Sequence, residues 1–530
     1  MKTGNQYEKK RKENSAEKVI LMIKKLQLPL QTMNLVVGFM VWVIISSLIP
    51  FISEDIAIAP ERLAIVTAVP VVLGSILRIP LGYYANVFGA RIIFLVSFIL
   101  LLFPVFYLSE ASSFTDLIIS GLFLGIGGAV FSVGVTSLPK YYPKERHGFI
   151  NGIYGAGNIG TAITTFSAPL IATQIGWSST VKIYLILLLV FAALNFFFGD
   201  RHEPKVKTPI IEQIKGVYKN EKLWFFSLFY FITFGSFVAF TIYLPNFLVN
   251  NFELDKVDAG MRTAGFIALA TFLRPVGGWL VDKLQPLLLL MGTFFVYTIA
   301  AIVLAFSPTI GIYTVGTLAI AVSAGIGNGV IFKLVPFYFN KQAGIANGIV
   351  SMMGGLGGFF PPIMLSIIFS VTGQYSIGFM LLSQVALASL VLVVWMYYQD
   401  RLQLAAEVFK STGQGILVTD ISGKIKTVNP AFTKLTGFEE SDVIGQNPSI
   451  MKSDKQPKGF YKEMWQEIEQ KGMWQGEIWN RRKNGEEYLQ WLNISAVKDD
   501  TGEVVRYVGT FTDITSEYQK KTGTIPVMTT

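Results

Sequence analysis

Residues 77–82 read LRIPLG and residues 273–278 read LRPVGG, so a leucine and an arginine open two similar stretches that lie 196 residues apart. The same offset relates five further pairs: Gly82 with Gly278, Asn86 with Asp282, Gly148 with Gly344, Asn151 with Asn347, and Gly152 with Gly348. Chance rarely preserves one offset over so many positions. The chain therefore contains an internal repeat, whose two copies should fold alike.

The repeat is built from apolar segments. Of the 530 residues, 52% are hydrophobic and 15% are charged, whereas a soluble domain carries about 25% charged residues. Apolar runs long enough to cross a bilayer recur from Asn34 to Tyr398. Charged loops and Pro/Gly clusters divide them into twelve spans, near residues 33–52, 62–85, 92–108, 115–138, 149–172, 179–198, 225–248, 262–282, 287–306, 310–335, 344–370 and 376–398. We predict an all-α membrane protein of twelve transmembrane helices in two six-helix repeats.

The charge distribution orients these helices. The net charge of +9 belongs to residues 1–400, because acidic and basic residues balance in 401–530. If loop 53–61 lies outside, the outer loops contain few basic residues and the inner loops many. The positive-inside rule then predicts a multi-pass protein of the cell inner (cytoplasmic) membrane with both termini in the cytoplasm.

The same boundaries divide the chain into parts. We expect a basic N-terminal segment (1–32), an N-terminal half (33–198), a linker (199–224), a C-terminal half (225–398), a soluble domain (402–516) and a tail (517–530). The basic segment is either an amphipathic helix on the inner membrane surface or an unstructured tail.

Composition excludes several kinds of site. Cysteine is absent, and the two histidines, His147 and His202, fall in polar loops. These counts argue against disulfides, thiol catalysis and a metal or haem site built on cysteine or histidine. We therefore expect no metal, no cofactor for the membrane part and no nucleic acid partner.

Two arginines are the strongest functional signal. Arg78 and Arg274 lie deep in the second and eighth spans, where a charge costs roughly 2.5–3.5 kcal/mol on insertion scales. Apart from Asp116 and Asp282 at span ends, no aspartate or glutamate lies inside a span to pair with them. A guanidinium matches a trigonal oxyanion with two parallel hydrogen bonds, so the pair favours a bound anion; the alternative is that each arginine reaches the interface or bonds backbone carbonyls. Lys333 either extends to the inner surface or adds a positive charge on the anion's exit route.

Glycines cluster in the fifth and eleventh spans. They are Gly155, Gly157 and Gly160, and Gly354, Gly355, Gly357 and Gly358. Small residues let transmembrane backbones approach closely, so packing explains most of them. The first cluster fits a dinucleotide-binding pattern but lacks the required strand and βαβ unit. Asn158, within it, is a polar side chain that we expect to face a cavity.

These features resemble the major facilitator superfamily. Its loop motif between helices two and three is matched by Gly82, Asn86, Gly89 and Arg91, with Asn86 in place of the usual acid; Asp282 and Lys283 keep a version of the motif in the second half. Within the superfamily, the arginines of helices two and eight and the two glycine signatures resemble the nitrate/nitrite porter family. The resemblance implies a nitrate and nitrite site in which Tyr230 and Phe234 of helix seven and Phe131 of helix four clamp the flat anion.

The transport mode stays open between alternatives. The resemblance implies alternating access by a secondary transporter, and the lack of a carboxylate in the spans favours nitrate/nitrite exchange by an antiporter. Nitrate/proton symport, transport of another small anion such as a carboxylate, and a membrane nitrate receptor are the other hypotheses.

The soluble part has a different pattern. Residues 415–420 and 425–429 predict a hairpin around Ser422-Gly423, and three more strands follow near 474–482, 487–495 and 504–511. The order of these strands resembles an α+β PAS sensory domain. The motifs that carry the resemblance lie at 429–432, 435–438, 480–485 and 513–515. Lack of cysteine argues against a flavin photoadduct. Trp474, Trp479, Trp491 and Asn480 resemble positions in flavin-binding PAS domains, so a flavin is one candidate ligand and no ligand the other. Its signal should act on the transporter or on a partner protein.

Overall fold

The computed structural model describes residues 2–58, 60–205, 209–254, 256–306 and 309–522, apart from some side chains within these ranges. The chain forms two compact units: a membrane unit, Met1–Met396, and a C-terminal unit, Tyr397–Thr530. The side chains of residues 2–21 and residues 523–530 lie outside this description, so the predictions for the N-terminal segment and the end of the tail stay predictions.

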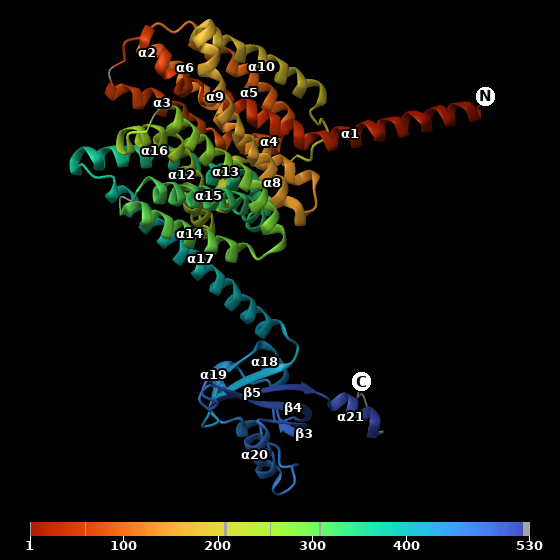
Figure 1. Cartoon of the computed structure of the whole chain (residues 1–530). Helices are drawn as coiled ribbons and strands as arrows, with labels where there is room; N and C mark the ends of the chain where they lie inside the picture. The colour runs from red at the N-terminus through yellow and green to blue at the C-terminus, as the bar shows by residue number, and fades with distance from the viewer. Residues whose placement is uncertain (1, 59, 206–208, 255, 307–308, 523–530) are drawn as a thin grey trace. The chain divides into compact units, whose positions relative to one another are not determined.

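The first half of the membrane unit contains several interrupted helices (Figure 1). In chain order its segments are α1 (Lys2–Trp42) with α2 (Ile44–Asp55), α3 (Pro60–Ile76) with α4 (Arg78–Phe88), α5 (Ala90–Ser109), α6 (Phe114–Ala129) with α7 (Phe131–Ser137) and the short turns η1 (Leu138–Tyr141) and η2 (Lys144–Arg146), α8 (His147–Gly155) with η3 (Ala156–Asn158) and α9 (Ile159–Ile175), and α10 (Trp177–Phe198). Two interruptions fall just before Arg78 and at Asn158, where candidate site residues lie.

The second half has longer, continuous helices. After the short α11 (Ile210–Val217) come α12 (Glu221–Phe252), α13 (Lys256–Lys283), α14 (Pro286–Ala305), α15 (Ile310–Tyr338) with η4 (Asn340–Gln342), α16 (Ala343–Thr372) and α17 (Ser376–Ser411). α12 packs closely on α16, and α13 packs on α15 and on α8 of the first half. The two halves therefore meet along α8, α13, α4 and α16.

Ten of the twelve predicted spans are long and apolar enough to cross a membrane in the part of the chain described. The first and fifth predicted spans, 33–52 and 149–172, are helical but are not among the ten. Both contain polar side chains that neighbouring helices cover: Asn34 is fully buried and exchanges hydrogen bonds of 2.8 Å with Asn195. Both spans are also divided between shorter helices, the first at Val43 and the fifth at Ala156–Asn158.

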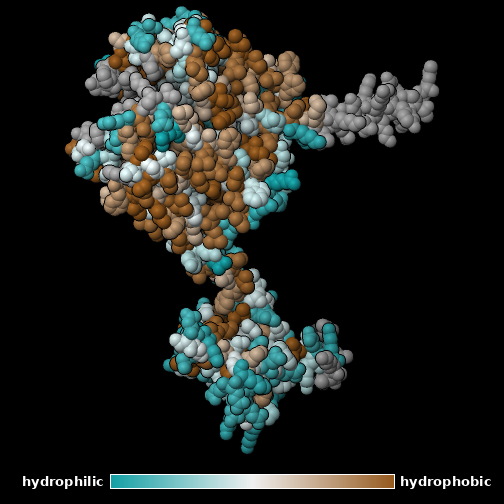
Figure 2. Space-filling view, viewed as in Figure 1, coloured by the Kyte–Doolittle hydropathy of each residue, from teal (hydrophilic) through white to brown (hydrophobic). Residues whose placement is uncertain are grey.

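The face of the membrane unit drawn in Figure 2 carries a broad apolar area between more hydrophilic margins. Large apolar side chains stand exposed on several helices, among them Phe103, Ile186, Phe272 and Val315. In water such a surface would be an aggregation liability, but it suits contact with lipid. The surface and the long apolar helices agree with a multi-pass membrane protein.

The C-terminal unit contains a five-stranded antiparallel sheet in the order β2-β1-β5-β4-β3. The strands are β1 (Gly415–Asp420), β2 (Ile425–Val428), β3 (Met473–Arg481), β4 (Glu487–Lys498) and β5 (Val504–Asp513), and they confirm the predicted strand pattern. The helices α18 (Pro430–Thr436), α19 (Glu440–Val443), α20 (Phe460–Lys471) and α21 (Thr515–Thr522) and the turn η5 (Pro448–Met451) complete the unit. Gly423 takes the left-handed conformation (φ 76°) that the first hairpin turn requires.

Candidate functional site

Arg78 is the first residue of α4 and is fully buried. Its Nη1 donates a hydrogen bond of 2.6 Å to the carbonyl oxygen of Ser351 in α16, so it reaches from the first half into the second. Its Nε and Nη2 find no hydrogen-bond partner among the described residues. The Ser351 carbonyl thus accepts a hydrogen bond from one nitrogen of the guanidinium, which agrees with the alternative that the arginine bonds a backbone carbonyl. The other two nitrogens have no partner among the described residues.

Arg274 lies in α13 and is 2% exposed. Its Nη2 donates a hydrogen bond of 3.1 Å to the hydroxyl of Tyr230 in α12. Its Nε and Nη1 are likewise without a partner in the described part of the chain. A buried polar group without a partner costs roughly 1–3 kcal/mol, and a charged one more, so each arginine carries donors suited to a ligand.

Two aromatic rings join the arginines. The Cζ atom of Arg78 lies 5.4 Å from the ring centre of Phe131 and 5.2 Å from that of Phe234, and the Cζ atom of Arg274 lies 5.4 and 5.6 Å from the same centres. The rings of Phe131 and Phe234 are nearly parallel (18°), with centres 6.2 Å apart. Tyr230 stacks on Phe234 with centres 5.0 Å apart. Residues predicted on four separate spans thus meet in one buried cluster.

The charge of this cluster is not balanced by acidic side chains. Within the described residues, neither Arg78 nor Arg274 forms an ion pair with a carboxylate. Two like charges in a medium of low dielectric constant repel each other strongly, and the aromatic faces offset only about 0.5–2 kcal/mol for each contact. The arrangement is suited to binding an anion.

The predicted glycines leave room for the cluster and for close helix packing. A Cβ atom on Gly155 would lie 2.6 Å from Nε of Arg274, and one on Gly354 would lie 2.1 Å from the Tyr230 ring. The other glycines of the two clusters have neighbours within 3.0 Å of such a Cβ: Gly157, Gly160, Gly355, Gly357 and Gly358. Two glycines therefore shape the site directly, and the rest let helices approach.

Asn158 lies in η3, between α8 and α9, and is 1% exposed. Neither its amide nitrogen nor its oxygen makes a hydrogen bond with a described residue. A buried amide with both ends unused is a second group suited to a polar ligand, and its role as a site residue stays a prediction. No contact between it and the arginines is observed.

The halves close against each other at one end of the membrane unit, which we name the Asp282 end. A Cβ on Gly82 would lie 2.6 Å from the Gly344 carbonyl oxygen, and one on Gly278 would lie 2.1 Å from that of Gly148. These two contacts are related by the sequence repeat. Backbones this close leave no passage between them, so the contacts must part if the site is to open toward this end.

Asp282 holds this closure together in the second half. Its carboxylate accepts hydrogen bonds of 3.0 and 2.8 Å from the backbone N–H groups of Gly148 and Phe149, at the start of α8. It also pairs with Lys333 at 2.7 Å, whose ammonium donates to the carbonyl of Lys144 as well. Lys333 is thus held by a carboxylate and by the first half, an arrangement that neither sequence hypothesis included.

The other predicted gating residues lie differently. Asn86 is buried, and its Nδ2 would lie 2.4 Å from a Cβ on Gly344. Arg91 donates to the Phe196 carbonyl within its own half, and Gly89 supplies the positive φ (90°) of the same turn. Lys283 lies over the ring of Trp279. Of the motif residues in the second half, Asp282 thus pairs with Lys333 rather than with its neighbour Lys283.

Two cross-half contacts were missed by sequence reasoning although the repeat marked their residues. Asn151 donates 2.9 Å to the carbonyl of Phe332, and Asn347 donates 3.3 Å to that of Val135. Each bond joins one half to the other. The pairing at an offset of 196 was the signal, but it does not say which neighbour an amide reaches.

The C-terminal unit has a packed interior. Its core contains twelve buried residues: Leu417, Ile425, Val428, Phe432, Val443, Met451, Met464, Ile468, Trp474, Ile478, Leu492 and Phe511. Asn480 is buried, and its amide can donate to the carbonyl of Met451 and accept from Gln490. Hydrogen bonds from Thr515 and Arg482 outweigh burial and lower the pKa of Asp513.

The four residues that suggested a flavin are divided between two faces of the sheet. Trp474 and Asn480 are buried on the inner face, since alternate residues of β3 point inward. Trp479 directly precedes Asn480 on β3, so its side chain points to the opposite face of the sheet. Trp491 is 45% exposed. Only two of the four can therefore contact a ligand in the interior.

Comparison with known proteins agrees with both units. Residues 32–362 match the Major Facilitator Superfamily, and residues 413–516 match the PAS domain. The "Nitrite extrusion protein" of Bacillus subtilis is 67% identical over 382 residues, covering 72% of this chain and 97% of that protein. The "Probable nitrate transporter NarT" of Staphylococcus epidermidis is 55% identical over 375 residues, covering 71% of this chain and 97% of that protein.

A solved structure supports the fold of the membrane unit. The human organic anion transporter MFSD10 is 12% identical, with a TM-score of 0.59 over 70% of this chain and 99% of that one. At this identity the likeness concerns the fold alone. The family matches carry the assignment: the chain belongs to the nitrate/nitrite porter family of the major facilitator superfamily, as a transporter that bears a C-terminal PAS domain.

Proposed function

We propose that this protein carries nitrate and nitrite across the cell inner membrane by alternating access. The observation that carries the proposal is the pair of buried guanidiniums, Arg78 and Arg274, with four nitrogens left without partners. Nitrate is planar and trigonal, and a guanidinium offers it two parallel hydrogen bonds. The names of the Bacillus and Staphylococcus relatives support this choice of anion.

The aromatic cluster adds a reason for a flat anion. Phe131 and Phe234 present nearly parallel faces beside both arginines. The hydroxyl of Tyr230 accepts from Arg274 and keeps its own hydrogen to donate. The site would hold the anion by its edges through the guanidiniums and by its faces through the rings.

We infer that transport is an exchange of nitrate for nitrite. No carboxylate among the described residues pairs with either arginine, so the site offers no evident proton carrier. Without an anion, two facing cations would resist the approach of the halves. A carrier that changes state only when loaded performs exchange, while a proton symporter must return empty.

Counterflow in proteoliposomes tests the mode. Vesicles loaded with nitrite and held without a pH gradient should take up labelled nitrate, and empty vesicles should not. Uptake that requires an imposed pH gradient would establish the proton symporter instead.

Competition tests the substrate class. Excess formate and oxalate should fail to compete with labelled nitrate for uptake; if they compete as well as unlabelled nitrate, the substrate is a broader class of small anion.

Replacement of either arginine by lysine tests the site itself. Arg78→Lys and Arg274→Lys keep the charge but remove the planar fork, and should lower uptake at least a hundredfold. The matched control is Arg201→Lys, since Arg201 is exposed in the loop after α10 and belongs to neither the arginine cluster nor the loop motif. Full uptake by both site variants would mean that the anion binds elsewhere.

The PAS domain supports a second candidate, a receptor that binds nitrate and signals through this domain. We favour instead a PAS domain that regulates the transporter. The basic inner loops indicate that both termini, and so this domain, lie in the cytoplasm. A chain that ends at Gln399 should still carry flux; loss of flux with retained nitrate binding would favour the receptor.

An absorbance spectrum of the full-length protein decides whether the PAS domain holds a flavin, since an oxidised flavin absorbs near 450 nm and an apoprotein does not.

A further inference from the structure

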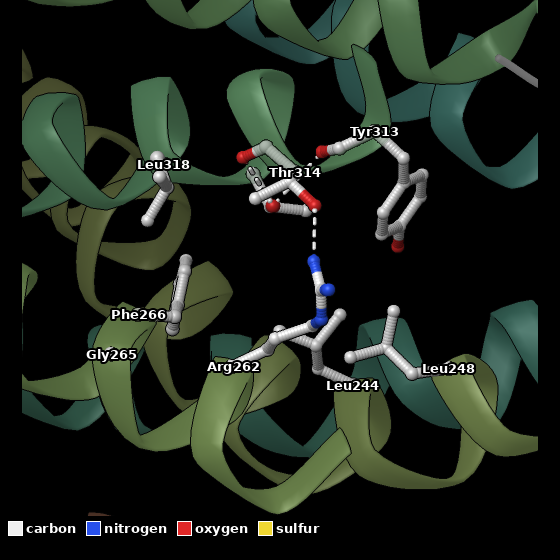
Figure 3. A pocket seen from close by; sticks show the side chains of 9 residues that line it. Leu244, Leu248, Arg262, Gly265, Phe266, Tyr313, Thr314 and Leu318 are labelled. Carbon is white, nitrogen blue, oxygen red and sulfur yellow. Dashed lines mark hydrogen bonds between the residues drawn. The ribbon is translucent and has the colours of Figure 1, made fainter. Parts of the chain in front are cut away.

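A pocket of about 210 Å³ lies between α12, α13 and α15, away from the site already described (Figure 3). Most of its wall is apolar, formed by Leu244, Leu248, Phe266 and Leu318, with polar groups from Arg262, Tyr313, Thr314 and Thr317. Arg262 and Leu318 are partly exposed, so the pocket opens to the surface of the membrane unit.

Its depth in the membrane follows from α13. Arg262 precedes Asp282 by twenty residues on this helix, which corresponds to about 30 Å at 1.5 Å per residue. The apolar part of a bilayer has a similar thickness. Arg262 therefore lies at the membrane edge opposite the Asp282 end, and its exposed neighbours Met261 and Val315 are apolar. The pocket mouth is placed where lipid head groups meet acyl chains.

Two polar groups at the mouth have unused capacity. Arg262 bonds Asp258 through Nε (3.1 and 3.2 Å) and Thr314 through Nη1 (3.2 Å), and its Nη2 shows no hydrogen bond to a described residue. Tyr313 is 2% exposed, yet its hydroxyl has no hydrogen-bond partner among the described residues. Figure 3 shows its ring on the pocket wall, near Leu248 and Arg262. A buried hydroxyl of this kind is suited to donate to a ligand.

The transported anion does not suit this pocket. Arg274 lies twelve residues farther along α13, about 18 Å away, so the two sites are distinct. The apolar wall offers a small inorganic ion few donors, while its leucines and Phe266 suit a hydrocarbon chain.

We propose that this pocket binds an amphiphile, an alkyl chain that ends in an anionic oxygen group. The chain lies against Leu244, Leu248, Phe266 and Leu318, and the anionic oxygen accepts hydrogen bonds from Arg262 and Tyr313. A free fatty acid and an anionic phospholipid of the bilayer share this chemistry. The site does not depend on which anion the protein transports.

Binding to the full-length protein in an uncharged detergent tests the proposal. Labelled dodecanoate should bind saturably with one site per chain, at least tenfold more tightly than dodecanol. Arg262→Gln should weaken binding at least tenfold, and Tyr313→Phe about three- to tenfold. Phosphatidylglycerol in nanodiscs should compete with dodecanoate if bilayer lipid is the source; lack of competition points to free fatty acid, and either result supports the pocket.

A glycine pair supplies a matched control. A Cβ on Gly265, in the pocket wall, or on Gly292, on α14, would meet no atom within 4 Å. Gly265→Leu should fill the pocket and abolish dodecanoate binding, whereas Gly292→Leu should leave it unchanged. Equal affinity for dodecanol and dodecanoate, or binding that survives all three pocket variants, would overturn the proposal.

Discussion

The closure at the Asp282 end should depend on the charge of one carboxylate. In the Asp282→Asn variant, the amide oxygen can still accept from the N–H of Gly148 and from Lys333, but the amide nitrogen faces the N–H of Phe149, and the negative charge beside the Lys333 ammonium is lost. The loss of one hydrogen bond to a charged group costs about 1.5–3 kcal/mol, and the partly exposed ion pair adds up to about 1 kcal/mol. We expect a total near 3 kcal/mol, roughly a hundredfold larger population of separated halves.

A single cysteine can report this change, since the natural chain has none. Val281 is 3% exposed and packs on Gly148 across the interface. In a Val281→Cys background, the rate of maleimide labelling follows the fraction of molecules with separated halves when closing is fast. Asp282→Asn should raise this rate thirty- to a hundredfold.

The control is Asp258→Asn, which removes an exposed carboxylate at the opposite edge. Asn86→Asp is the reciprocal test, because Asn86 is the repeat mate of Asp282 and packs beside Gly344 near the start of α16. A carboxylate there should slow labelling. If Asp282→Asn leaves the labelling rate unchanged, or if the control raises it equally, the carboxylate does not hold the halves together.

Three further predictions concern the site and the PAS domain. Tyr230→Phe removes the acceptor of an arginine hydrogen bond, so the KM for nitrate counterflow should rise about five- to tenfold; an unchanged KM would show that the hydroxyl is idle. Gly155→Ala pushes against a site guanidinium and should reduce uptake more than tenfold, while Gly292→Ala should have no effect. Hydrogen bonds, first that from Ser422, hold the pKa of Asp420 below its usual range, so its carboxylate stabilises the PAS domain above about pH 4 and this contribution is lost as the pH falls further. Urea unfolding of the C-terminal unit should show Asp420→Asn as destabilising at pH 7 and neutral well below pH 3.

The repeat carried most of what could be predicted about the fold and the site. It marked the two arginines and the glycines at which the halves touch, because symmetric positions share one packing environment. Partners across the interface were not predictable: Lys333 pairs with Asp282, and its repeat mate Ser137 gave no hint of this. The first and fifth spans were predicted as apolar runs between loops, but the sequence did not show that each is divided into shorter helices. Buried polar side chains in them, such as Asn34, find their partners through tertiary contacts, which no local window of sequence contains.

The near-parallel rings of Phe131 and Phe234 have a consequence for shape. Their centres are 6.2 Å apart, and an atom held between two carbon faces needs about 3.5 Å on each side, or about 7 Å in all. The distance between the ring centres is the largest value that the gap between the ring planes can have, so a flat ion one atom thick requires the rings to part by at least about 0.8 Å. A tetrahedral ion such as sulfate or phosphate has oxygens above and below any plane through its centre and would need a much wider gap. The gap between the two rings would therefore select ions by their thickness. It would exclude common cellular oxyanions that the two positive charges alone would attract.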